Sequence, residues 1–348
     1  MTLRVVSEEP SARQDGFGTR TVVQVPGLGR VERLVLSPPL ATPASEQAIR
    51  ARAAYLTGVA DGPLVQVLRI ERGNASLSVL TPALDGVTVS ELLAALEFGA
   101  LTLSGEELLE LLTSIVRAAG ALHASLGTLC HGALAPEHVA VMRDGSTRFT
   151  GAIFGDAIQA LQRNRERLWH EFGLALPASA GMPRVDRRGD VMQLGMLVLG
   201  LIEGRSLGRN EFPMGFEELA RAASIDMPGS DVVGLRRWLA GTLHLNGRVV
   251  FDSAVAAARA FERLLPPGGG DGGAALALRT AVRQLCGHPD SRSGTSAGSS
   301  CEQSTSVQAP GLLPFRDAAL RSEAAPLFLD GSIHLRSGGG HRAGGVRG

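Results

Sequence analysis

The chain contains no lysine: all 34 of its basic residues are arginines. A mechanism that needs a lysine ammonium is therefore excluded, because the planar guanidinium of arginine is not an equivalent point charge. Aromatic residues are also scarce, at 4% of the sequence, whereas apolar residues make up 44%. The hydrophobic core must therefore be built mainly from aliphatic side chains.

Cysteine, net charge and long apolar runs are scarce as well. The three cysteines, Cys130, Cys286 and Cys301, are an odd and sparse set that fits a reducing compartment and no disulfide framework. The formal net charge is zero, which gives no electrostatic basis for binding nucleic acid. The longest apolar run, Val191–Ile202, is shorter than the roughly 20 residues that a membrane span needs. Because no charged-then-apolar leader opens the sequence, we expect a cytoplasmic protein without a membrane span.

The spacing of apolar residues divides the chain into four parts. Residues 1–20 predict a loose leader, residues 21–88 a β-rich part with one helix, and residues 89–265 a larger helical part. Residues 266–348 are rich in Gly, Ser and Ala and predict a disordered tail with at most one transient helix at 275–285. The expected strands are 21–25, 31–36, 64–70 and 77–80, and the expected helices are 46–56, 104–122, 190–203, 216–223, 233–243 and 253–265.

The segment His131–Val139 carries the most informative motif. It resembles the catalytic loop of protein kinases, H-R-D-L-x-x-x-N, and follows a helix whose start is marked by the capping box of Ser104 and Glu107. The resemblance implies a catalytic base at position 133 and a metal-binding Asn at position 138. The chain has Ala133 and His138 at these positions.

Further segments in register extend the resemblance over about residues 20–265. Ile153-Phe154-Gly155 resembles D-F-G with Ile153 in place of the magnesium-binding Asp, and Asp190 opens a run similar to the start of the large buried helix of kinases. The kinase resemblance implies that Asp190 anchors the backbone of the catalytic loop and that His131 holds this loop against Phe154. The residues expected to keep such structural roles are His131, Pro136, Phe154, Gly155, Asp190 and Arg248.

The N-terminal part keeps little of a kinase nucleotide site. Gly27 and Gly29 lie where the loop G-x-G-x-x-G would begin, but Glu32 replaces the third glycine. No V-A-I-K strand is identifiable, and Arg52 stands near the place of the glutamate that would pair with its lysine. We therefore predict Gly27 and Gly29 as the cofactor-contacting residues if a nucleotide binds at all.

The missing residues all serve the same chemical step. Phosphoryl transfer relies on cations that offset the charge of the triphosphate and on a carboxylate that orients the attacking hydroxyl. Removing one electrostatic stabiliser commonly costs on the order of 10²–10³ in rate, and here the Lys, both metal ligands and the base are absent. Relocated groups could compensate, and the candidates are Arg30, Arg33, Asp156 and Glu137.

His131 admits two other roles besides the structural one. It could act as a general base, or it could bind a metal together with His123, Cys130 and His138. The spacing of these four residues matches no known zinc template, so we predict no metal site.

The sequence thus predicts an α+β, two-lobed kinase-like fold, with an N-lobe over residues 21–88 and a C-lobe over residues 89–265. We interpret the chain as a pseudokinase: a binding, scaffold or regulatory module for a protein partner in bacterial-type Ser/Thr phosphosignalling. No cofactor is expected, although ATP with Mg²⁺ stays possible. The first alternative is an enzyme, either a divergent ATP-dependent Ser/Thr protein kinase or another nucleotide transferase with relocated catalytic residues. The second is an unrelated α+β interaction protein in which the motif arises by chance.

Overall fold

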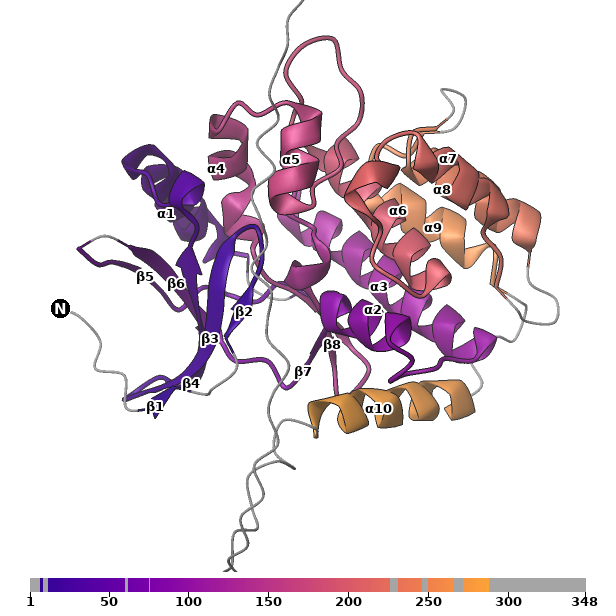
Figure 1. The fold of residues 1–348 in the computed structure, drawn as a ribbon, viewed down its shortest axis with the longest axis horizontal. Helices are drawn as coiled ribbons and strands as arrows, with labels where there is room; N and C mark the ends of the chain where they lie inside the picture. Colours follow the sequence, from indigo (N-terminus) through magenta and orange to yellow (C-terminus); the bar gives the residue numbers. More distant parts are fainter. Residues whose placement is uncertain are drawn as a thin grey trace, which may run out of the picture. The chain divides into compact units, whose positions relative to one another are not determined.

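The computed structural model describes residues 7–8, 12–59, 62–74, 76–225, 231–245, 250–265 and 272–287. Two compact units divide the chain, residues 1–293 and 294–348, and all described residues belong to the first. Within this unit a β-rich lobe precedes a helical lobe along the chain (Figure 1), so the predicted two-lobed α+β architecture is confirmed. No helix in the described ranges has the length and apolar character needed to cross a membrane.

The N-terminal lobe is built around an antiparallel sheet of strand order β1-β3-β4-β6-β5, and β2 also pairs with β3. β3 and β4 form a hairpin that pairs from Gly18↔Leu36 to Val25↔Gly29. Gly27 and Gly29 have positive φ in its turn, a conformation that glycine adopts without steric cost. The elements of this lobe are β1 (Ser7–Glu8), β2 (Arg13–Gln14), β3 (Gly18–Val25), β4 (Gly29–Leu36), η1 (Pro38–Leu40), α1 (Pro43–Leu56), β5 (Arg69–Arg72) and β6 (Leu77–Pro82).

Residues 12–20 are ordered, which differs from the loose leader expected over residues 1–20. Arg13–Gln14 forms β2, and β3 begins at Gly18. Asp15 closes the turn between the two strands, because its carboxylate accepts hydrogen bonds from the backbone N–H groups of Phe17 and Gly18. A strand of two residues is too short to show the alternation of apolar and polar residues that reveals strands in a sequence.

The C-terminal lobe begins with a short strand and two helices that start at capping boxes. Thr88 and Glu91 cap α2, and Ser104 and Glu107 cap α3, as predicted for the latter pair. A small antiparallel sheet of order β7-β8-β9 precedes the remaining helices. The elements are β7 (Gly86–Thr88), α2 (Val89–Glu97), α3 (Gly105–Leu126), η2 (Pro136–His138), β8 (Val139–Met142), β9 (Thr147–Phe149), η3 (Ala152–Phe154), α4 (Gly155–Ala160), α5 (Arg165–Phe172), α6 (Arg187–Glu203), η4 (Arg209–Glu211), α7 (Gly215–Ala222), α8 (Val232–Thr242), α9 (Ala254–Glu262) and α10 (Gly272–Cys286).

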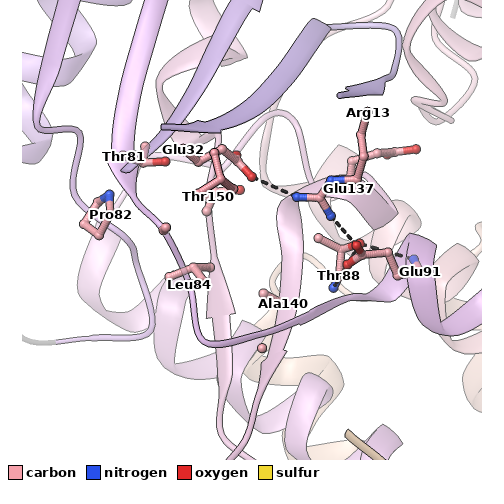
Figure 2. A pocket seen from close by; sticks show the side chains of 13 residues that line it. Arg13, Glu32, Thr81, Pro82, Leu84, Thr88, Glu91, Glu137, Ala140 and Thr150 are labelled. Atoms are coloured by element: carbon pink, nitrogen blue, oxygen red, sulfur yellow. Dashed lines mark hydrogen bonds and ion pairs between the residues drawn. The ribbon is translucent and has the colours of Figure 1, made fainter. Parts of the chain in front are cut away.

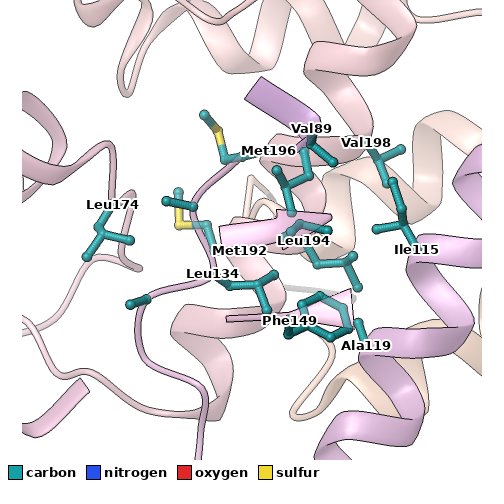
Figure 3. Close-up of a cluster of buried hydrophobic side chains, with 14 of the residues drawn as sticks. Val89, Ile115, Ala119, Leu134, Phe149, Leu174, Met192, Leu194, Met196 and Val198 are labelled. Carbon is teal, nitrogen blue, oxygen red and sulfur yellow. The ribbon is translucent and has the colours of Figure 1, made fainter. Parts of the chain in front are cut away.

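One hydrophobic core runs from the N-terminal sheet through the helical lobe. Helix α6 lies in this core and is buried on all sides from Gly189 to Leu201. Figure 3 shows Leu194 of α6 beside Ile115 of α3 and Phe149 of β9. Most of the packed side chains are aliphatic, in keeping with the low aromatic content.

Helix α10 lies within the segment that we predicted to be a disordered tail. Its Leu278 and Val282 are buried, and the helix packs against α3 and β7. Two apolar residues one turn apart are enough to fix the helix on the domain, although the surrounding composition indicates disorder. Residues 266–271 and 288–348, the rest of the predicted tail, lie outside the described residues.

Candidate functional site

Asp190, in the first turn of α6, anchors the backbone of the predicted catalytic loop. Its carboxylate accepts hydrogen bonds from the backbone N–H of His131 at 2.5 Å and of Gly132 at 2.7 Å. His123 Nε2 donates a third bond to the same carboxylate at 2.9 Å, and Ala254 N donates to Nδ1 of this ring. All of these groups are buried, so the loop backbone is fixed by charge-assisted hydrogen bonds without competition from water.

His131 is a neutral, hydrogen-bonded core residue. Its Nε2–H donates to the backbone oxygen of Thr150 at 2.8 Å, and its Nδ1 accepts from Ala133 N at 3.2 Å. Burial lowers the pKa of His131 to about 4. The ring packs edge-on against Phe149, with centroids 6.1 Å apart, instead of against the expected Phe154. Both ring nitrogens are used in hydrogen bonds to the backbone of Ala133 and Thr150, which leaves neither for base catalysis.

The position of the catalytic base is closed to substrates. Ala133 is 0% exposed and belongs to the hydrophobic core. Gly132 beside it has φ +80°, and a Cβ at this position would lie 2.6 Å from the Cα of Gly155. The loop therefore passes directly against residue 155, which only glycine at position 132 allows.

The two metal-ligand positions expected from the resemblance are occupied by His138 and Ile153. A Cβ built on Gly151 would lie 2.7 Å from His138 Nδ1, so these two residues are direct neighbours. Ile153, which we predicted to replace the metal-binding Asp, lies two residues further along, buried in η3. Neither Gly151 nor Ile153 carries a carboxylate.

An aromatic cluster surrounds His138. The ring of Phe17 packs edge-on against it, with centroids 4.3 Å apart, and Phe154 stacks on it at 5.7 Å. Phe17 also contacts Phe154 at 5.4 Å and Phe172 of α5 at 5.3 Å. His138 Nδ1 donates to Ala133 O, and burial lowers the pKa of His138 well below its ordinary value. His138 is therefore a neutral ring packed between aromatic side chains.

The four residues considered as a zinc cluster take separate partners. His123, His131 and His138 each hydrogen-bond to the backbone or to Asp190, and burial raises the pKa of Cys130 to about 12, so its thiol stays protonated. In the part of the chain that the structure describes, no three His, Cys, Asp or Glu side chains form a group that could hold a metal ion.

Comparisons with known proteins identify the fold. No protein-family model and no curated protein sequence matches the chain. Its structure is similar to the Mycobacterium tuberculosis PknI kinase domain, with 21% identity and a TM-score of 0.51 over 75% of this chain and 96% of that domain. It is also similar to the kinase domain of maize SIRK1, sucrose-induced receptor kinase 1, bound to AMP-PNP, with 15% identity and a TM-score of 0.56 over 76% and 93%. The chain has a protein-kinase fold.

The kinase cleft between the lobes is spanned by an ion-pair bridge. Arg13 of β2 reaches Glu32 of β4 at 3.1 Å and Glu91 of α2 at 2.5 Å (Figure 2). Glu32, the residue at the third glycine position, also pairs with the buried Arg20 at 2.8 Å. The bridge joins the N-terminal sheet to the first helix of the C-terminal lobe.

The cavity behind this bridge is small and acidic. It measures about 50 Å³, which is room for a few water molecules, whereas pockets for organic ligands commonly measure about 300–1,000 Å³. Three carboxyl groups, of Glu32, Glu91 and Glu137, line it together with one guanidinium, of Arg13. Burial raises the pKa of Glu137, but Glu32 and Glu91 still outnumber Arg13. Such a lining disfavours a triphosphate.

Of the groups proposed to rescue catalysis, only Glu137 lines this cavity. Asp156 pairs with Arg52 at 2.8 Å. Arg33 lies opposite Thr21 and Leu80, on the sheet face away from Glu32, and Arg30 is exposed near the hairpin turn with Gly27 and Gly29. Arg248 lies outside the described residues.

Sequence reasoning missed Arg52 as a residue that connects the lobes. This α1 side chain is buried and donates to the backbone oxygens of Cys130 and Ala152 as well as to Asp156. It therefore ties α1 to both segments that flank the degenerate centre. The signal in the sequence was an arginine where a kinase helix has its glutamate, a reversal of charge that requires different partners.

Proposed function

We propose that the chain is a pseudokinase, a kinase-fold module that binds a protein partner in Ser/Thr phosphosignalling and does not transfer phosphate by the ordinary route. The observation that carries this proposal is the position of Phe17. Its ring packs on Phe154 and on His138, the residue at the position where the kinase resemblance implies a metal-binding Asn. A buried aromatic ring there offers no ligand to a metal ion and excludes water-solvated anions.

The electrostatics of the cleft support the same proposal. A nucleoside triphosphate needs cations, but the cavity has more carboxylates than guanidinium groups, and the chain has no lysine to supply. The base position is fully buried at Ala133, so a substrate hydroxyl has no access to it. The favoured role is therefore binding through a rigid surface. The residues at the expected catalytic positions form part of the buried core instead.

A thermal-shift titration with ATP, ADP and Mg²⁺ tests the proposal directly. A ligand at 100 times its dissociation constant stabilises a protein by about 2.7 kcal/mol, which is a shift of several degrees. We expect no shift at millimolar nucleotide, with or without Mg²⁺, and no transfer of labelled γ-phosphate to the chain or to a generic protein substrate. Mg²⁺ alone and ATP alone are the controls. A rise in melting temperature that requires ATP and Mg²⁺ together would favour the divergent-enzyme alternative.

A further inference from the structure

The C-terminal lobe carries an open groove that shares no lining residue with the cavity in the cleft. α10 forms one wall and residues 100–102, between α2 and α3, form the other; Figure 1 shows α10 running alongside this part of the lobe. The groove measures about 530 Å³, roughly ten times the volume of the cavity in the cleft. Its wall residues include Leu101, Thr102, Leu276, Ala277, Thr280 and Ala281.

One large apolar side chain is exposed in the lining of this groove, and a second is exposed close to it in the sequence. Leu276 is 58% exposed on the groove side of α10. Phe98 is 84% exposed and precedes the groove residue Ala100 by two positions. Aromatic side chains are few in this chain, and leaving one in water forgoes a large burial energy. An exposed Phe and Leu next to a groove are typical of a surface that a partner covers.

The shape of the α10 wall suits a helix. Gly273, Ala277 and Ala281 recur every four residues and line the groove, so one ridge of α10 consists of small side chains. Such a ridge lets a second helix approach at the short end of the usual 8–10 Å interaxial distance. The opposite face of α10, with Leu278 and Val282, is buried on the lobe, so the helix itself is firmly seated.

The α3 side of the groove is acidic, whereas the α10 wall carries two arginines, Arg279 and Arg283, and no acidic residue. From residue 73 to residue 116 the sequence has no Arg or Lys, and its acidic residues are Asp85, Glu91, Glu97, Glu106, Glu107 and Glu110. Glu107 lines the groove, and Glu106 and Glu110 lie on the same first turns of α3. Arg279 of α10 lies instead close to Gly145, in the β8–β9 turn. The α3 side of the groove therefore attracts cations.

We propose that this groove is the docking site for a basic amphipathic α-helix of a partner protein. The apolar face of that helix packs on Leu276, Ala277 and Phe98, and its Arg or Lys side chains face Glu106, Glu107 and Glu110. Recognition of this kind uses apolar anchors at helical spacing for affinity and charge for orientation. The site does not depend on whether the cleft binds a nucleotide.

Fluorescence anisotropy with designed peptides tests the site on the full chain. The probe is an 18-residue labelled peptide with Leu on one helical face and Arg on the other. The two comparison peptides have Glu in place of Arg, and the same composition as the probe in scrambled order. We expect the Leu/Arg helix to bind, its affinity to fall with salt, and the other two to bind at least tenfold more weakly.

Variants of the protein locate the binding. Ala277→Arg fills the groove and repels the cationic face, so it should weaken binding at least tenfold, and the double variant Glu106→Gln/Glu110→Gln should weaken it about threefold. Val233→Arg is the matched control, because it places the same charge at an exposed apolar position on α8, 67% exposed, away from the groove. Circular dichroism confirms that each variant is folded. Equal binding by Ala277→Arg and Val233→Arg, or equal binding of the Arg and Glu peptides, would overturn the proposal.

Discussion

The two faces of the loop at residues 131–138 are held by different kinds of contact. The face toward the helices keeps the carboxylate of Asp190 on two backbone N–H groups and on His123. The face toward the cleft has Ala133 and His138 where the kinase resemblance implies a base and a metal ligand, and Phe17 packs there on His138. The comparison teaches that the shape of this loop is set by directional hydrogen bonds on one face, while the other face packs into the buried core.

The two faces use different forces. Hydrogen bonds to a buried carboxylate are directional, and removing the acceptor leaves donors without partners. Ring packing is less directional, and its stability scales with the apolar area removed from water. The anchored face should therefore respond to changes of single atoms, and the aromatic face to changes of volume.

Asp190→Ala should have the largest effect on the anchored face. It leaves the N–H groups of His131 and Gly132 and the His123 ring buried without their acceptor, at about 1–3 kcal/mol each, so we expect a total loss of about 4–6 kcal/mol in the free energy of unfolding. Urea denaturation measures it. Asp186→Ala is the matched control: this cap of α6 accepts two backbone N–H groups at a partly exposed site, and its loss should cost about 1 kcal/mol. Similar losses for both variants would contradict the anchoring role.

Phe17→Ala should break the aromatic face. Deleting a buried phenyl ring commonly costs about 3–5 kcal/mol, and this ring contacts His138, Phe154 and Phe172. The cavity that results is apolar, so the variant should still show no thermal shift with ATP and Mg²⁺. Phe98→Ala serves as the control, since its ring is exposed and its removal should change stability by under about 0.5 kcal/mol. Magnesium-dependent ATP binding by Phe17→Ala would show that the ring alone blocks an otherwise competent site.

Acidic pH should lower the free energy of unfolding through His131. The folded-state pKa is about 4, below the value of about 6.5 for an unfolded chain, so only the unfolded state binds this proton between pH 6.5 and pH 4. The contribution of neutral His131 is therefore complete above pH 6.5 and falls by roughly 3 kcal/mol as the pH drops to 4. Urea unfolding at several pH values measures the slope. His131→Gln should lose about one proton of this dependence, and an unchanged slope would argue against a buried neutral ring.

Arg13→Ala should have the smallest effect. Its ion pairs with Glu32 and Glu91 are partly exposed, and such pairs contribute below about 1 kcal/mol. The change opens the mouth of the cleft without altering either face of the loop. Arg117→Ala, which removes an exposed pair with Glu262, is the control of equal type. A large drop in the melting temperature of Arg13→Ala would contradict this expectation. It would mean that the bridge contributes more to stability than an exposed ion pair does.

The sequence was sufficient to predict features that depend on local spacing. The interval from His131 to His138 and the position of Asp190 at the start of an apolar helix predicted the loop and its anchor. The alignment of the next segment with D-F-G at Ile153-Phe154-Gly155 stays a prediction; in the structure Gly151, two residues before Ile153, also lies beside His138. Pairing between strands would have been needed to align it.

The contents of the cleft could not be predicted, because they depend on residues distant in the chain. Phe17 belongs to a segment whose polar neighbours indicated a loose leader, and nothing local ties it to His138. The same holds for Arg13 and Glu91, which are 78 positions apart. Tertiary contacts of this kind leave no periodic signal in a single sequence.

The buried guanidinium of Arg52 has a consequence for how the molecule opens. It donates at once to the backbone of residue 130, to that of residue 152 and to Asp156, from a helix of the other lobe. If one of these three segments separates alone, an N–H donor of Arg52 loses its hydrogen-bond partner. Amide hydrogen exchange should therefore find α1, the loop after Cys130 and η3 opening together as one cooperative unit. Enzymes with two lobes use hinge motion between them to admit and release ligands. In this molecule such motion would require the free energy of this local unfolding.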